Sequence, residues 1–314
     1  MRPRPSKLVT AIAAVVIAAP LASGCEAKVY GTPPEPAGPP LTVIAPMGTK
    51  APLPESPPDE PAAAFDGLTV RAQQAATEAA KSGADISAVV LDRNTNQVIS
   101  SGNAAPTPIA SVVKLFIADD LLLQEAKGQT DLTPEDRTAF DTMLRSSDDS
   151  AAEVFWERSG GSAIVTRVAA RYGLGSTTAP YDGHWWNTMS TTADLVRYYD
   201  MLLDGSGGLP PEKASIILSN LAQSTPIAID GTQPGGVYPQ RFGIPDGLSR
   251  EAVAVKQGWM CCWNGGNWMH MSTGVIGADR RYVMAIGSMQ PTDDSTARDT
   301  ITQAVKTMFP GGRI

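Results

Sequence analysis

The sequence is poor in the residues that metal sites and histidine-dependent hydrolases require. It contains only two histidines, His184 and His270, and three cysteines among 314 residues. It has no Gly-X-Ser-X-Gly motif, and its His, Cys, Asp and Glu residues do not show the spacing of metal ligands. We therefore expect neither a Ser-His-Asp hydrolase nor a metalloenzyme, and the sequence indicates no cofactor.

Positive charge is also scarce. The formal net charge is -7, and Lys and Arg form no long run. A nucleic-acid-binding protein needs a basic face for the phosphate backbone, so we expect no nucleic acid partner. Apolar residues make up 42% of the chain, which is enough for one large core or for two closely packed subdomains. The composition is that of a globular protein.

The amino terminus has the pattern of a bacterial export signal. Cationic residues between positions 2 and 7 precede the apolar run Leu8–Leu21, which is too short to span a bilayer comfortably. The following Leu21-Ala22-Ser23-Gly24-Cys25 resembles a lipobox, so we expect a signal peptide at 1–24 and a diacylated Cys25. Two acyl chains would anchor the protein at the extracytoplasmic face of the cell membrane. The alternative is an ordinary secretory peptide that leaves Cys25 as a free thiol.

Residues 25–64 are predicted to be a linker behind the lipidated cysteine. Eleven prolines lie between Thr32 and Pro61, interleaved with Ala, Glu and Gly, and no apolar period persists. Proline-rich chain extends by ~3.1 Å per residue, so this tether could reach on the order of 100 Å from the membrane. That reach suits a cell-wall substrate, and a passive spacer explains it equally well.

Residues 65–314 are predicted to form one folded α/β domain. Helical periodicity at Leu68–Ser82 is followed by a hairpin, and three strands and a helix close the chain. The hairpin strands are 86–92 and 97–101, the late strands are 252–257, 268–276 and 282–288, and the closing helix is 295–308. Only helical patterns lie between, at 109–126, 133–144, 151–159, 163–172, 193–203 and 211–222. We therefore expect an antiparallel sheet built from both chain ends and flanked by helices, with an all-helical insertion at about 107–225.

Ser111 and Lys114 form the first candidate site. Positions i and i+3 share a helix face, so the hydroxyl and the amine can approach hydrogen-bond distance. The surrounding residues 109–123 are apolar around nearly the whole helix, which predicts burial. Burial favours a neutral lysine, and a neutral lysine can act as the base for a serine nucleophile. About one Ser-X-X-Lys is expected by chance in a chain of this composition. The assignment of a site therefore depends on the burial of Ser111 and Lys114 and on further residues that contact them.

Two later motifs supply possible partners. Ser147-Asp148-Asp149 could place the Ser147 hydroxyl as a proton carrier between the lysine and a leaving group. Its alternative role is structural, because the following Ser150-Ala151-Ala152-Glu153 matches a capping box. Lys256-Gln257-Gly258 ends a predicted strand, and Gly258 would allow close approach of a substrate backbone. A lysine that simply extends along the protein surface is the alternative for Lys256.

In order and context these three motifs resemble those of the class A β-lactamase and penicillin-binding protein superfamily, over essentially the whole chain after Phe65. The resemblance implies the β-lactamase/transpeptidase-like fold. It also implies a role for each motif. Ser111 would be the acylated nucleophile, Lys114 its activating partner and Ser147 the proton shuttle. Lys256 would be the cation of the third motif, and the backbone amides of Ser111 and Trp259 would form the oxyanion hole. More narrowly, the lipobox, the linker and the Trp-Met-Cys-Cys stretch resemble the LppW-type lipoproteins of mycobacteria.

The sequence departs from the superfamily pattern at several positions. Asp149 replaces an Asn that donates a hydrogen bond to substrate, and a carboxylate there would pair with Lys114 or Lys256 and favour the charged amine. Gln257 replaces Thr or Ser, and we nevertheless count it among the candidate substrate-binding residues, which are Asp149, Lys256, Gln257, Gly258 and Trp259. The stretch between the first two motifs is short, which implies a trimmed helical subdomain. The loop 180–192 has no glutamate to activate a deacylating water, so efficient β-lactam hydrolysis is not expected.

Cysteines and tryptophans gather near the third motif. Adjacent Cys261 and Cys262 could form a vicinal disulfide outside the cytoplasm or remain as buried thiols. The tryptophans could line a cleft or pack in the core; they are Trp185, Trp186, Trp259, Trp263 and Trp268.

Three functions are compatible with this sequence. The first is a serine acyl-transfer enzyme that acts on peptidoglycan stem peptides or on other small amides and esters through acyl-Ser111. The second is a degenerate member that binds muropeptides or protein partners without turnover. The third is β-lactam hydrolysis by an unfamiliar route of water activation. The sequence determines neither the natural substrate nor the oligomeric state.

Overall fold

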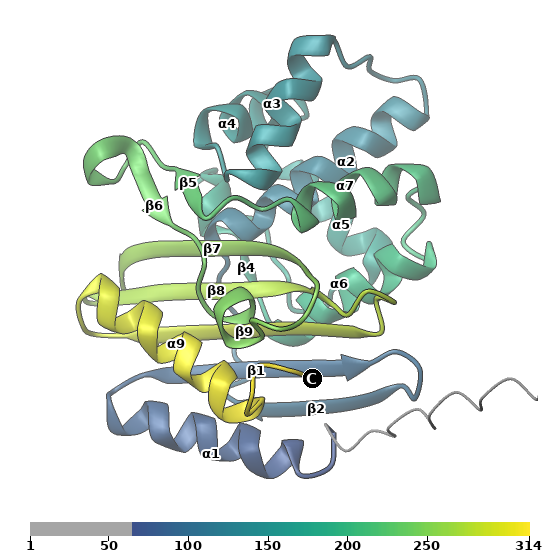
Figure 1. The fold of residues 1–314 in the computed structure, drawn as a ribbon. Coiled ribbons are helices and arrows are strands. Elements are labelled where there is room, and N and C mark those ends of the chain that lie inside the picture. The colour runs from purple at the N-terminus through teal and green to yellow at the C-terminus, as the bar shows by residue number, and fades with distance from the viewer. Residues whose placement is uncertain (1–64) are drawn as a thin grey trace, which may run out of the picture. The chain divides into compact units, whose positions relative to one another are not determined.

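The computed structural model describes residues 65–314, and the predictions for the signal peptide, Cys25 and the linker lie outside these residues. The described chain contains a five-stranded antiparallel sheet in the order β2-β1-β9-β8-β7 (Figure 1). The strands are β1 (Asp85–Asp92), β2 (Gln97–Gly102), β7 (Val253–Trp263), β8 (Asn267–Ile276) and β9 (Tyr282–Gln290). Strands from both ends of the domain meet where β1 pairs with β9, which confirms the predicted architecture.

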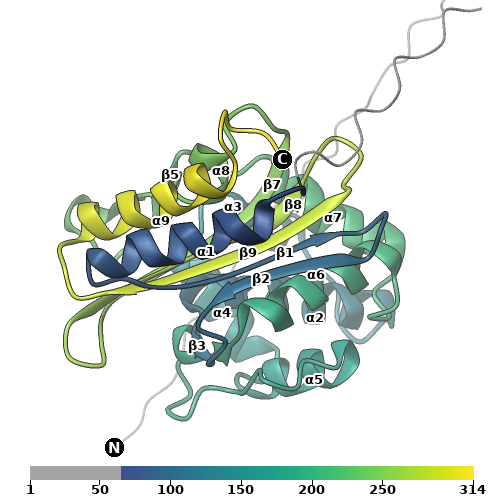
Figure 2. The same ribbon diagram turned by 90° about the horizontal axis from the view of Figure 1, so that it is seen from below.

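Two helices from the ends of the domain cover one face of the sheet. Figure 2 shows α1 (Leu68–Lys81) and α9 (Asp294–Met308) side by side on this face. Buried alanines recur at helical spacing in both helices, which lets the two backbones pack closely. These alanines are Ala72, Ala75 and Ala79 in α1 and Ala297 and Ala304 in α9.

The other face of the sheet carries the helical region. Its helices are α2 (Lys114–Ala126), α3 (Pro134–Arg145), α4 (Asp149–Arg158), α5 (Ala163–Tyr172), α6 (Thr192–Asp204) and α7 (Pro211–Ala222). Helix α2 is central and is buried on every side from Lys114 to Leu123, as its mostly apolar sequence predicts. Within residues 65–314, no helix combines the length and apolar character needed to cross a bilayer.

The helical region also contains strands that the sequence did not indicate. β3 (Thr107–Pro108) pairs with β4 (Met189–Ser190), and β5 (Ile227–Ile229) pairs with β6 (Val237–Pro239). The chain between the two strand groups also contains the short helical segments η2 (Trp185–Asn187), η3 (Pro234–Gly236) and α8 (Ile244–Gly247), of which α8 contacts α9. The prediction of only helices between the two strand groups is therefore wrong. Strands of two or three residues are too short to display a period of two.

A buried polar network holds α2 against its neighbours. Asp119 is fully buried in α2 and pairs with Arg171 and the Tyr172 hydroxyl, both from α5. Burial raises the pKa of Asp119, and the Arg171 guanidinium opposes this rise. The Tyr198 hydroxyl of α6 donates to the Leu115 carbonyl at 3.3 Å. These bonds fix the helix whose first residue is Lys114.

Arg171→Met should destabilise the protein strongly, because it leaves Asp119 buried without its cation. We expect a loss of about 3 kcal/mol in the free energy of unfolding, measured by urea denaturation. Arg137→Met is the control, since Arg137 is 53% exposed in its ion pair with Glu125 and its loss should cost under about 1 kcal/mol. Equal losses in the two variants would contradict the structural role given to the Asp119 network.

Candidate active site

Ser111 lies in a strained turn that precedes α2. The predicted helix 109–126 is in fact a 3₁₀ turn, η1 (Ala110–Val113), followed by the α-helix from Lys114. Side chains at i and i+3 eclipse in a 3₁₀ turn, which brings those of Ser111 and Lys114 into line. Ala110 has a φ of 42°, a left-handed conformation that costs a non-glycine residue roughly 1–2 kcal/mol. Such strain is common next to catalytic groups.

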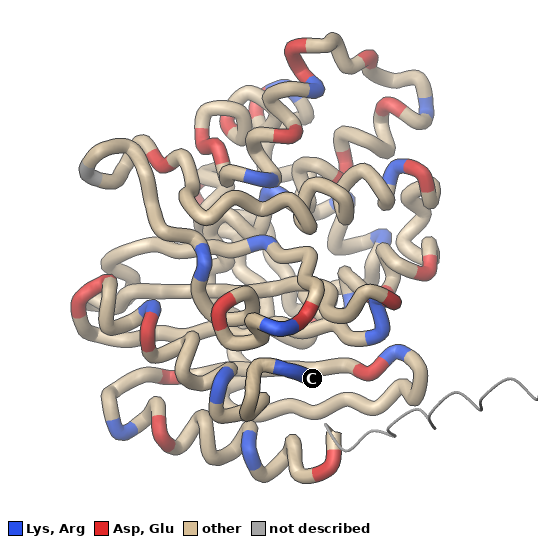
Figure 3. Tube along the Cα trace, in the orientation of Figure 1, with Lys and Arg blue, Asp and Glu red and all other residues tan. Residues whose placement is uncertain are grey.

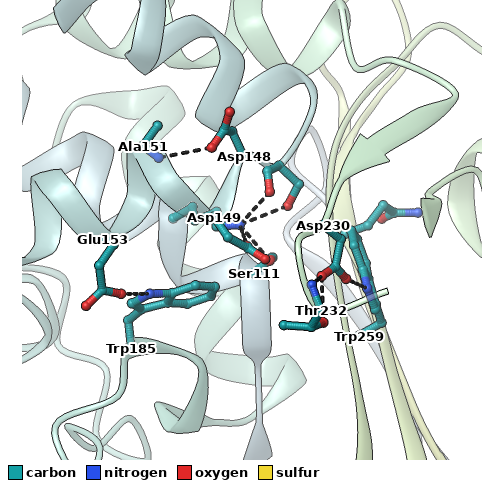
Figure 4. A network of polar contacts seen from close by, with 12 residues as sticks. Ser111, Asp148, Asp149, Ala151, Glu153, Trp185, Asp230, Thr232 and Trp259 are labelled. Carbon is teal, nitrogen blue, oxygen red and sulfur yellow. Dashed lines mark hydrogen bonds and ion pairs between the residues drawn. The ribbon is translucent and has the colours of Figure 1, made fainter. Parts of the chain in front are cut away.

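The Lys114 amine is fully enclosed by hydrogen-bond partners. Its Nζ lies 2.9 Å from Ser111 Oγ, 2.6 Å from Asp149 Oδ1, 2.7 Å from the Ser147 carbonyl oxygen and 3.2 Å from Ser147 Oγ. Figure 4 shows Ser111 and Asp149 meeting at this point. The Trp185 ring centroid lies 4.7 Å from the same nitrogen. The structure therefore brings the first two sequence motifs together at one amine.

Burial and the Asp149 carboxylate act on this amine in opposite directions. Burial lowers the pKa of Lys114, while the negative charge of Asp149 favours the protonated form. Burial likewise raises the pKa of Asp149, and Lys114 opposes that rise. The pairing that we expected between Asp149 and a site lysine is thus present. The charged forms of Lys114 and Asp149 are less stable here than they would be in water, because the amine is completely buried.

Ser147 connects the two lysines of the site. Its backbone φ is 54°, and its hydroxyl is fully buried. Ser147 Oγ accepts hydrogen bonds from Lys256 Nζ at 2.9 Å and from Lys114 Nζ at 3.2 Å. A serine oxygen that accepts two bonds still has its own O–H to donate. Burial, and then the charge of Lys114, lowers the pKa of Lys256 well below its ordinary value.

The capping role near the second motif belongs to Asp148. The Asp148 carboxylate accepts a hydrogen bond from the Ala151 N–H at 3.0 Å and is the N-cap of α4. The alternative of a capping box from Ser150 to Glu153 is therefore wrong. Glu153 Oε2 instead accepts from the Trp185 indole at 2.9 Å. Asp149 is the first residue of α4, and its side chain reaches Lys114.

Gln257 and Gly258 have structural contacts in place of the expected substrate contacts. Gln257 is buried and donates its amide to the Phe242 carbonyl at 2.5 Å, so the prediction that it binds substrate is corrected. A Cβ on Gly258 would lie 2.4 Å from the Ile109 carbonyl oxygen. The close approach that requires glycine at 258 is therefore that of the η1 turn, against which β7 packs.

A pocket of about 470 Å³ opens above Ser111. Of the predicted site residues, Ser111, Asp149 and Trp259 line it, whereas Lys114, Ser147, Lys256, Gln257 and Gly258 do not. The sequence did not single out two acids in its wall, Glu153 and Asp230. Asp230 accepts from the Trp259 indole at 2.8 Å (Figure 4). The Asp-Gly-Thr sequence at 230–232 indicates a turn and nothing more, so Asp230 could not have been found from its neighbours.

The remaining candidates lie at or outside the rim of this pocket. Cys261 and Cys262 are joined by a vicinal disulfide where the pairing of β7 with β8 shifts register, and Cys261 lines the pocket. Trp185 and Trp186 also line it, but Trp263 and Trp268 do not. Asp182, the only acid in the loop 180–192, accepts bonds from the His184 N–H and the Asn187 amide and does not line the pocket. No acid of the loop 180–192 therefore faces Ser111.

The chain is similar over its whole length to curated mycobacterial proteins. It is 56% identical over 323 aligned positions to proteins named as LppW lipoproteins in Mycobacterium tuberculosis and Mycobacterium bovis, with 100% of each chain covered. The chain belongs to the LppW lipoprotein family. No family model matches the sequence.

Solved structures share the fold at low sequence identity. A β-lactamase from Chitinophaga pinensis aligns with a TM-score of 0.60 and 14% identity over 76% of this chain and 97% of its own. A point mutant of PBP-A, solved as an acyl-enzyme complex with penicillin G, aligns with a TM-score of 0.62 and 16% identity over 77% and 95%. The TLA-3 extended-spectrum β-lactamase aligns at 0.60 and 13% identity. The chain therefore has the fold of class A β-lactamases and penicillin-binding proteins.

Gly258→Ala should destabilise the protein by about 1–3 kcal/mol, because the new methyl group meets the Ile109 carbonyl of the η1 turn. Thermal unfolding measures the change. Gly175→Ala is the matched control, since a Cβ there meets nothing within 4 Å. If both variants unfolded at the temperature of the parent protein, the close packing of β7 against η1 would be refuted.

Proposed function

We propose that the protein is a lipid-anchored envelope enzyme that transfers acyl groups through an acyl-Ser111 intermediate, acting on cell-wall peptides or on related amides and esters. The observation that carries the proposal is the 2.9 Å contact between Ser111 Oγ and a fully buried lysine amine at the floor of a pocket. This is the geometry of a nucleophile and its activating base.

The hydrogen bonds support a specific neutral state of Lys114. An uncharged amine has two N–H groups and one lone pair. The Ser147 carbonyl and Asp149 Oδ1 can only accept from it, which leaves the lone pair directed at the hydroxyl of Ser111. In this state no N–H of Lys114 remains for Ser147 Oγ, which accepts from Lys256 alone. Lys114 then takes the Ser111 proton as Ser111 Oγ bonds to the substrate carbonyl carbon.

Collapse of the tetrahedral intermediate needs a proton on the leaving group. We assign its delivery to Ser147, whose hydroxyl contacts both Lys114 and Lys256 and can be reprotonated from them. Because Ser147 is buried behind the pocket wall, this step requires its side chain to turn toward the pocket. The bond from carbon to the leaving nitrogen or oxygen breaks, and acyl-Ser111 remains. Ser111 and Trp259 both line the pocket, and we assign stabilisation of the oxyanion to their backbone amides. Water or an acceptor amine then attacks acyl-Ser111 and regenerates the serine.

Two observations favour envelope anchoring. The relatives at 56% identity are named as lipoproteins, and the sequence Leu21–Cys25 has the small residues and cysteine of a lipidation site. The Pro-rich residues 25–64 would then separate the membrane from the folded domain at 65–314.

A second candidate function is binding without turnover. The 2.6 Å contact between Lys114 and Asp149 favours it, because a carboxylate at this distance stabilises the ammonium that cannot act as a base. In that case the pocket would hold a muropeptide or a protein partner. Efficient β-lactam hydrolysis forms no part of either proposal, since no glutamate occurs at 180–192.

Acylation of Ser111 tests the choice between these candidates. The protein is incubated with a fluorescent penicillin and, separately, with a neutral activated ester, and intact-mass spectrometry records the added acyl group. We expect a durable adduct that is lost in Ser111→Ala. The absence of a Ser111-dependent adduct with both reagents would refute the enzyme and favour the binding protein. Transient labelling with destruction of the penicillin would instead indicate a β-lactamase.

The rate of acylation should rise with pH, because only the deprotonated Lys114 accepts the serine proton. Burial lowers the pKa of Lys114 and so moves this rise below the ordinary lysine range. Asp149→Asn keeps an oxygen acceptor but removes the charge that stabilises the ammonium. The rise should then move to lower pH, and the rate at neutral pH should increase about tenfold for each unit of pKa lost.

Asp148→Asn is the matched control for this experiment. It removes the same charge from the neighbouring residue, which caps α4 and does not contact Lys114. Its effect on the pH profile should be clearly smaller than that of Asp149→Asn. An unchanged or slower acylation in Asp149→Asn would contradict the role given to the Lys114–Asp149 contact.

A further inference from the structure

The pocket above Ser111 concentrates negative charge and aromatic surface. Three carboxylates line it, those of Asp149, Glu153 and Asp230, and Trp185 and Trp186 form part of its wall. No Lys or Arg is among its lining residues. Elsewhere in the described chain, acidic and basic positions are interspersed (Figure 3). The charge of this pocket is therefore a local feature.

The two site lysines lie behind the pocket wall. Lys256 is 1% exposed, and its amine donates to Ser147 Oγ at 2.9 Å and to the Gln257 carbonyl at 3.1 Å. Lys114 is completely buried among its own four contacts. Neither amine is presented to the pocket, so a substrate carboxylate would meet acids and indoles without a facing cation.

Asp149 presents only acceptors to a ligand. Its Oδ1 binds Lys114, and Oδ2 makes no hydrogen bond to the described residues. The residue lines the pocket with its side chain 31% exposed. An ionised carboxylate cannot donate, so this position is suited to a ligand N–H or ammonium group and repels a carbonyl oxygen.

Glu153 and the adjacent indoles form one side of the pocket. The Trp185 N–H holds Glu153 Oε2 at 2.9 Å, and the Trp185 and Trp186 rings meet at 88° with centroids 5.0 Å apart. The His184 ring stacks on Trp186 at 4.6 Å and supports it. Aromatic faces at right angles beside a carboxylate are a recognised arrangement for binding cations.

Asp230 forms the opposite side and is a buried acid, 4% exposed, that makes no direct ion pair within the described residues, although its charge acts on Lys114. It accepts from the Trp259 indole at 2.8 Å, from the Thr232 N–H at 2.9 Å and from the Thr232 hydroxyl at 2.6 Å. Figure 4 shows Asp230 and Glu153 on opposite sides of Ser111. These bonds hold its charge in place, and a bound cation would compensate it.

We propose that the pocket selects substrates that carry a positively charged amine near the acyl group presented to Ser111, and that it disfavours substrates with a carboxylate there. The inference rests on the proposed acyl-transfer site and names its substrate class. A primary ammonium in this pocket is attracted by the carboxylates of Asp149, Glu153 and Asp230 and contacts those on the side where it binds. The preference is set by ground-state binding, so it can be measured without any reaction.

The test uses three unreactive ligands of similar size on the full-length protein. They are Nα-acetyl-L-lysine amide, Nα-acetyl-L-norleucine amide and Nα-acetyl-L-glutamate amide, whose side chains are cationic, neutral and anionic. Tryptophan fluorescence reports binding, because Trp185 and Trp186 line the pocket. We expect the lysine ligand to bind about tenfold more tightly than the norleucine ligand, and the glutamate ligand to bind most weakly.

Glu153→Gln locates the effect in this pocket. Its amide oxygen can still accept from the Trp185 indole, so the wall is preserved while one charge is lost. The lysine-over-norleucine preference should fall about threefold or more. Glu157→Gln is the matched control: Glu157 is an exposed acid in the same helix and does not line the pocket. Its preference should equal that of the parent protein.

Equal binding of the lysine and norleucine ligands, tighter binding of the glutamate ligand, or equal effects of the two substitutions would each overturn the inference. The outcome is separable from that for acyl transfer. A preference for the cation without any Ser111 adduct would keep this inference and refute the enzyme. A Ser111 adduct without a preference for the cation would support the enzyme and refute this inference.

Discussion

The burial of one amine organises the candidate site. Lys114 has no solvent contact, and its nitrogen lies within hydrogen-bond distance of Ser111, Ser147 and Asp149. Ser111 lies in a strained turn, Ser147 has a strained backbone, and Asp149 begins a helix. All three must be held in place for the amine to keep its hydrogen bonds. Helix α2 lies in the middle of the domain, and its first residue, Lys114, is therefore buried behind the wall of the pocket.

The same amine also bears on what can be concluded from the shared fold. A shared fold does not establish a shared activity, and the three solved structures compared above are below 20% identical to this chain. What decides the chemistry is the competition at Lys114 between burial, which favours the neutral base, and Asp149, which favours the ammonium. The carboxylate that restrains the base also presents an acceptor to the pocket. In this account Asp149 therefore affects both the reactivity of Ser111 and the charge of the ligands that the pocket binds.

Much of this organisation could be predicted from the sequence, and the failures have physical causes. Long periodic segments such as 68–82 and 163–172 were placed correctly, and the approach of Ser111, Lys114 and Ser147 followed from the order of the motifs. Strand alternation alone could not tell that Gln257 faces away from the pocket, since that depends on which face of β7 meets the helices. Glu153 and Asp230 were missed because only the tertiary fold places α4 and the turn after β5 around one pocket.

The most direct test of the account is the titration of Lys114 itself. NMR of protein labelled with ¹³C at the lysine ε-carbons follows each amine with pH, and the Lys114 signal is assigned by its loss in Lys114→Arg. The account predicts that Lys114 releases its proton below the ordinary lysine pKa of about 10.4, since burial outweighs the Asp149 charge. A Lys114 that titrates at or above the ordinary value would contradict it, because the amine would then be a permanent counter-ion and not a base.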